Sequence, residues 1–111
     1  MEYLHTKEAK ALYKAFLSLQ TIDEYKRFLG DLLTPAEIKE FSNRWKVAQM
    51  LDKKIPYEVI EKETSMSTTT IARISKWLSG SLGNLGGYQL VLKRMKNRTK
   101  KQNKIHHTSQ M

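Results

Sequence analysis

The side chains best suited to chemistry lie in residues 67–78, a segment that opens with one serine and three threonines. Ser67 can cap a helix by accepting the amide of Thr69 or Thr70. In a helix, short side chains with hydroxyl or methyl groups and the two basic side chains would lie on the side opposite the apolar residues Ile71, Ile74 and Leu78. Such groups can approach base edges in a DNA major groove, while cations bind phosphates. The predicted DNA-binding residues are Ser67, Thr68, Thr69, Ala72, Arg73, Ser75 and Lys76.

The charge distribution favours a nucleic-acid partner for this segment. All 11 acidic residues precede Ser67, together with 11 of the 20 lysines and arginines, so that part is neutral. The other basic residues follow Ser67 without any acid, so the formal net charge of +9 belongs to the second part of the chain. A wholly basic region attracts the phosphate backbone. The alternative is that the three threonines are only a polar helix start, and the basic region argues against it.

Helical spacing dominates the chain, and three helices are expected before the basic region. One apolar stripe runs from Leu4 to Leu19 and would make a first helix of about four turns. A second, shorter stripe runs from Ile22 to Leu32. The third helix has the clearest start, because residues 34–37 combine a capping threonine, a proline at the first helical position and a glutamate three residues after the cap.

Residues 56–78 are expected to form two short helices around a tight turn, with Val59 and Ile60 facing inward. Glu61 stands where a helix-turn-helix usually has alanine. Its carboxylate would oppose DNA binding if it faced phosphate, so it has to point elsewhere or be offset by the basic region. Ser65 stands where the turn usually has glycine, and a left-handed non-glycine residue costs a tolerable ~1 kcal/mol.

The glycine-rich residues 79–87 must bend, and a sixth helix should follow with its apolar stripe from Tyr88 to Met95. We predict one helical DNA-binding and dimerisation domain over residues 1–97, with the helix-turn-helix at 56–78. Residues 98–111 are expected to be a basic, disordered tail. That tail is either simply solvated or an arm that follows the phosphates.

The remaining composition excludes several classes of protein. Cysteine is absent, which rules out disulfides, thiol chemistry and cysteine-bound zinc. No signal peptide or membrane-spanning stretch is found, so a cytoplasmic protein is expected. Neither a catalytic set nor a phosphate-binding glycine loop appears, so we expect no enzyme activity. No metal site and no cofactor are expected either.

Residues 32–78, LLTPAEIKEFSNRWKVAQMLDKKIPYEVIEKETSMSTTTIARISKWL, resemble the Trp repressor family, in its shorter Trp-repressor-like branch with an undefined effector. The order of helices extends the likeness over roughly residues 1–95. The resemblance implies an all-α, six-helix fold that interlocks as a homodimer. It also implies a bacterial regulator that binds a two-fold symmetric operator with half-sites about one helical turn apart.

In that family, tryptophan binds between the third helix and the recognition helix. The resemblance maps the two arginines of the family pocket onto Arg44 and Arg73. It maps two pocket threonines onto Thr34 and Thr70. The alternative for Arg44 is a surface or intersubunit ion pair.

Two departures weaken the case for tryptophan as effector. Ile74 stands where the family has the glycine that admits the indole ring, and Trp77 stands where it has a serine near the ligand's amino group. A branched side chain would fill the space of the ring, and an unpaired amino group would cost about 1–3 kcal/mol. Either one of these residues fills the pocket and DNA binding is constitutive, or a different small-molecule effector is used.

The sequence therefore predicts a homodimeric, sequence-specific transcriptional regulator of double-stranded DNA, acting as a repressor. Two other classes stay open. One is a nonspecific basic protein that binds DNA or RNA, and the other is a protein-interaction adaptor whose helix-turn-helix no longer meets DNA.

Overall fold

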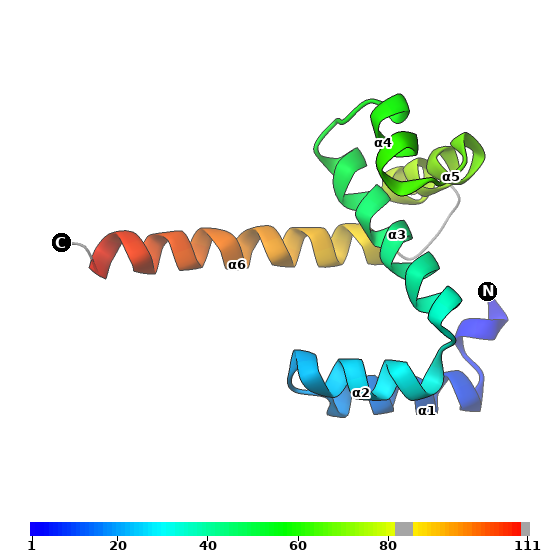
Figure 1. Ribbon diagram of the computed structural model, residues 1–111. Helices are drawn as coiled ribbons and strands as arrows, with labels where there is room; N and C mark the ends of the chain where they lie inside the picture. Colours follow the sequence, from blue (N-terminus) through cyan, green and yellow to red (C-terminus); the bar gives the residue numbers. More distant parts are fainter. Residues whose placement is uncertain (82–85, 110–111) are drawn as a thin grey trace. The chain divides into compact units, whose positions relative to one another are not determined.

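The protein is described by a computed structural model, which defines the backbone of residues 1–81 and 86–109 and the side chains of residues 1–81 and 86–99. These residues form six α-helices and one short 3-10 helix, and they contain no strand (Figure 1). The expected all-α class is therefore confirmed. The chain divides into two compact units, Met1–Glu40 and Phe41–Met111, so the division lies within the third helix.

The first unit contains η1 (Glu2–Leu4), α1 (Lys7–Ser18) and α2 (Ile22–Leu32). The prediction that the first helix already includes Leu4 is wrong. The Thr6 hydroxyl accepts a backbone amide three residues further on at 3.0 Å and so starts α1 at Lys7. Thr21 caps α2 in the same way, at 3.2 Å.

Aromatic rings join the two helices of the first unit. Phe16 stacks on Tyr25 with 6.5 Å between ring centroids and meets the edge of Phe28 at 5.7 Å. Even so, no residue of α1 or α2 is buried. Leu17 is 83% exposed and Ile22 is 78% exposed, so apolar surface remains uncovered in this unit.

Helix α3 (Pro35–Asp52) begins with the predicted capping box. The Thr34 hydroxyl accepts the amide of Glu37 at 3.2 Å, and the Glu37 carboxylate accepts the amide of Thr34 at 2.9 Å. These bonds to Thr34 hold the pKa of the Glu37 carboxyl below its usual value, because they favour the charged form. Lys54 follows the end of the helix in the left-handed region, with φ 63°.

The second unit adds α4 (Tyr57–Thr64), α5 (Thr68–Ser79) and α6 (Gly87–Ser109) to most of α3 (Figure 1). Its core is a cluster of aliphatic side chains from α3, α4 and α5, all of them buried. The cluster consists of Val47, Ala48, Met50, Ile60, Ile71 and Ile74.

This core confirms that Ile71 and Ile74 hold α5 in place. The inward placement of Val59 is wrong, because that side chain is 41% exposed. Ile60 and Thr64 lie one turn apart and occupy the inner face of α4 instead. The Thr64 hydroxyl donates to the Ile60 carbonyl at 2.6 Å, which satisfies a polar group inside the core.

Left-handed residues shape the connections on both sides of α5. Ser65 has φ 57° at the turn after α4, as expected from its position. Gly80 ends α5 with φ 78°, and Gly86 precedes α6 with φ 74°. Residues 82–85 of the predicted glycine bend lie outside the described residues.

Helix α6 differs from the expectation at its end. We expected a disordered tail from residue 98, but the helix runs without a break from Gly87 to Ser109. The physical reason is that residues 88–109 contain no glycine or proline to stop it and are rich in lysine, arginine and glutamine, which are good helix formers. The basic side chains from residue 100 onward lie outside the described part, so an arm that follows phosphates stays a prediction.

Candidate DNA-binding surface

The start of α5 is fixed by Ser67. Its hydroxyl oxygen accepts the amide of Thr70 at 3.2 Å, so the predicted cap is present. The Ser67 and Thr70 hydroxyls also share a hydrogen bond at 3.0 Å. These contacts give both residues a local structural role and hold the first turn of α5 in one conformation.

Five of the seven predicted DNA-binding residues share one face of α5. Together they line a hollow along the exposed side of the helix, with two hydroxyls, one methyl group and two cations. They are Thr68, Thr69, Ala72, Arg73 and Lys76. Such a face can hydrogen-bond to base edges, contact a thymine methyl group and pair with phosphates.

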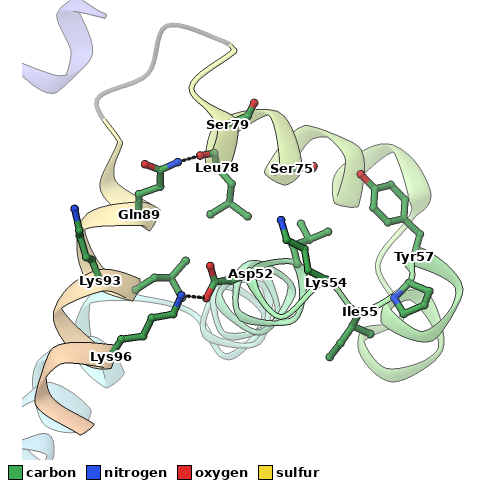
Figure 2. Close-up of a pocket in the computed structure, with 13 residues that line it drawn as sticks. Asp52, Lys54, Ile55, Tyr57, Ser75, Leu78, Ser79, Gln89, Lys93 and Lys96 are labelled. Atoms are coloured by element: carbon green, nitrogen blue, oxygen red, sulfur yellow. Dashed lines mark hydrogen bonds and ion pairs between the residues drawn. The ribbon is translucent and has the colours of Figure 1, made fainter. Parts of the chain in front are cut away.

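Ser75 does not belong to this face. It is half-buried and lines a different cavity, together with Tyr57 of α4 and residues of α3 and α6 (Figure 2). Its position follows from helical periodicity, because Ser75 lies between the exposed face and the buried side that carries Ile71 and Ile74.

Glu61 does not point away from the start of α5. Its carboxylate accepts a hydrogen bond from the Thr68 hydroxyl, and the side chain is half-buried. The hydroxyl hydrogen of Thr68 is therefore directed at Glu61, which leaves the oxygen lone pairs of Thr68 to accept hydrogen bonds from outside. Sequence reasoning missed this contact, because residue spacing alone does not show how two neighbouring helices meet.

The residues aligned with the family's effector pocket have different surroundings. Ile74 is 5% exposed and packs in the aliphatic core, while Trp77 is half-buried on α5. Arg73 is exposed and belongs to the DNA-binding face described above. The burial of Ile74 agrees with the expectation that its side chain fills the space of an indole ring. The effector pocket itself stays a prediction.

Arg44 lies on α3 near the ring of Tyr88, which stacks on Trp45 with 6.4 Å between ring centroids. Burial raises the pKa of the Tyr88 hydroxyl, and the positive charge of Arg44 offsets part of that rise. Thr34, the last predicted pocket residue, belongs to the Met1–Glu40 unit, where it caps α3.

The described part of the chain shows neither a group of metal ligands nor a membrane span. No group of three or more His, Asp or Glu side chains there could hold a metal ion. Among the same residues, no helix is long and apolar enough to cross a membrane.

Comparisons with known proteins agree with this arrangement. The chain is 38% identical to the uncharacterized protein YerC of Bacillus subtilis over 96 residues, which cover 86% of this chain and 89% of that protein.

Two crystal structures are also similar. One is a TrpR-like protein from Eubacterium eligens, with a TM-score of 0.79, 34% identity and coverage of 86% of this chain and 96% of that one. The other is a candidate Trp repressor from Staphylococcus aureus, with a TM-score of 0.77, 34% identity and coverage of 86% and 92%. The family model of the Trp repressor protein matches residues 7–96, so the chain belongs to the Trp repressor family.

Proposed function

We propose that the protein is a cytoplasmic, homodimeric transcriptional repressor that reads a two-fold symmetric operator through α5. The observation that carries the proposal is the exposed face of α5 with its hydroxyls, methyl group and two cations, at the start of a region without acids. Membership of the Trp repressor family supports a DNA-binding regulator of this kind.

Exposed apolar side chains support the homodimer. In the first unit, Leu17 and Ile22 are largely exposed. In the second unit, the outer face of α6 carries Leu90, Val91 and Met95, each with almost half or more of its surface exposed. Burial of apolar surface is worth ~25 cal/mol per Å², so a second copy of the chain that covers these faces would be strongly favoured. Sedimentation of a folded monomer in dilute solution would contradict the homodimer.

The roles of the side chains divide by chemistry. Thr68 and Thr69 are placed to hydrogen-bond to base edges, and Ala72 to contact a thymine methyl group. Arg73 and Lys76 are placed to bind phosphates, which orients the protein without reading sequence. Loss of a base contact should relax one position of the operator, whereas loss of a phosphate contact should weaken all duplexes alike.

The test is competition binding with selected and random duplexes. The wild type should prefer its selected duplex at least about a thousandfold. Thr69→Ala should reduce that preference, and Arg73→Ala should weaken both duplexes, whereas the exposed Arg27→Ala on α2 serves as a charge-matched control. Equal affinity of the wild type for all duplexes would indicate a nonspecific basic protein. Unchanged affinity in both α5 variants would indicate an adaptor.

Tryptophan is not the proposed effector. The buried Ile74 occupies the position at which the family admits the indole ring, and the serine near the ligand's amino group is replaced by Trp77. Calorimetry should therefore detect no tryptophan binding at micromolar concentrations. Micromolar binding would show that the argument from Ile74 is wrong.

A further inference from the structure

A cavity of about 770 Å³ lies in the second unit, between the end of α3, the start of α4, the second half of α5 and the first turns of α6 (Figure 2). Its apolar lining includes Leu92, which is buried, and Leu51 and Leu78, which are half-buried against the core. None of the residues aligned with the family's effector pocket lines it. The volume falls in the range of small-molecule sites, about 300–1,000 Å³.

The charged groups around the cavity are mainly positive. Lys54, Lys93 and Lys96 line it, against the single carboxylate of Asp52 (Figure 2). Lys96 forms an ion pair with that carboxylate, with 2.7 Å between Lys96 Nζ and Asp52 Oδ2. The side-chain ammonium groups of Lys54 and Lys93 make no hydrogen bond or ion pair with the described part of the chain. The cavity thus combines an apolar interior with the ammonium groups of Lys54 and Lys93, which are available to bind an anion.

We propose that this cavity binds a small organic carboxylate with an apolar body. The leucine side chains would cover the apolar body, which removes it from water. The Lys93 ammonium group would pair with the carboxylate, and Lys54, which lies on the other side of the cavity (Figure 2), adds positive charge. The hydroxyls of Tyr57 and Ser75 can contribute hydrogen bonds from the cavity lining.

The site is placed to influence α5. Ser75 and Leu78 belong to that helix, and Tyr57 begins α4. A ligand in the cavity therefore touches both helices of the predicted helix-turn-helix. This step rests on the proposed function: an occupied cavity changes the affinity for the operator, because the ligand holds α5 against α6 in one of its available positions.

The test begins without DNA and uses hexanoate as the probe. Acetate carries the same charge without the chain, hexan-1-ol carries the chain without the charge, and hexylamine carries the opposite charge. Calorimetry should show hexanoate binding about tenfold or more tightly than each comparator. The charge-assisted pair, worth roughly 1.5–3 kcal/mol, distinguishes it from hexan-1-ol and hexylamine, and burial of the chain, at about 0.8 kcal/mol per CH2, distinguishes it from acetate. Amide NMR shifts should centre on Ser75, Leu78 and Leu92.

A matched pair of variants locates the binding. Lys93→Met keeps the aliphatic stem and removes the cation, and it should weaken hexanoate binding about fivefold or more. Lys10→Met on α1 makes the same change outside the cavity and should leave binding unchanged. Equal binding of hexanoate and hexan-1-ol, no binding of hexanoate, or an unaffected Lys93→Met variant would each overturn the proposal.

The operator assay separates this proposal from the proposed function. Hexanoate at a concentration that half-saturates the wild type should change operator affinity in the wild type and clearly less in Lys93→Met. If hexanoate binds but operator affinity stays the same, the coupling is wrong and the site stands. If the protein prefers no duplex at all, the proposed function fails, while the binding result without DNA still decides the site.

Discussion

Thr64 offers a sharp test of how the two helices around the turn are held together. Its side chain is 4% exposed. Its hydroxyl donates to the Ile60 carbonyl at 2.6 Å and accepts the amide of Met66 at 3.3 Å. Thr64→Val preserves the shape of the side chain and removes both hydrogen bonds, so it isolates the contribution of the hydroxyl.

The magnitude follows from the two bonds. A net hydrogen bond contributes about 1 kcal/mol, and an amide left unpaired in a partly buried place costs about 1–3 kcal/mol. The added methyl group of valine recovers roughly 0.8 kcal/mol. Thr64→Val should therefore lower the free energy of unfolding by about 1–3 kcal/mol. The exposed Thr69→Val on α5 makes the same chemical change and should stay within about 0.5 kcal/mol of the wild type.

The assay is urea unfolding followed by circular dichroism. All variants are compared at one protein concentration, because the stability of the proposed dimer would depend on concentration. A Thr64→Val variant as stable as Thr69→Val would show that the buried hydroxyl contributes nothing, and the description of the turn would be wrong.

Three further changes have defined outcomes. Ser65→Gly should raise the free energy of unfolding by about 0.5 kcal/mol, because glycine relieves the left-handed backbone by more than its own entropy cost. An unchanged or lower free energy of unfolding in urea would count against strain at φ 57°. Glu61→Gln should tighten binding to every duplex a few-fold in anisotropy titrations. The substitution removes a negative charge and keeps an oxygen that accepts the Thr68 hydroxyl. Weaker binding would show that the carboxylate itself is needed. Because the pKa of Glu37 is lowered, its stabilising contribution should be present above the ordinary glutamate pKa and be lost as the pH falls through the lowered pKa. An NMR titration of the Glu37 carboxyl carbon should show the lowered pKa. Thr34→Ala should return the pKa of Glu37 toward its ordinary value.

Features that depend on short stretches of sequence were predictable. Thr34 and Glu37 form the capping box because both partners lie within one turn. Ser67 caps α5 for the same reason. Ile71 and Ile74 anchor α5 because helical periodicity fixes which side chains share a face.

Features that depend on how helices meet were not predictable. The contact between Glu61 and Thr68 is set by the angle between α4 and α5, which residue spacing does not encode. Ser75 carries a short hydroxyl that would suit a contact with a base. It lines the cavity instead, because α3, α4 and α6 lie beside that face of α5. Helix α6 continues beyond residue 98 because helix propensity acts there without apolar contacts, so low hydrophobicity alone does not predict where it ends.

Selection of bound duplexes from a random pool tests most directly whether α5 reads a specific operator as part of a two-fold symmetric dimer. The expected result is an enriched, two-fold symmetric sequence with half-sites about one helical turn apart, and with relaxed preference at one position of each half-site when Thr69→Ala is used. A selected pool that keeps the base composition of the starting pool would contradict the claim.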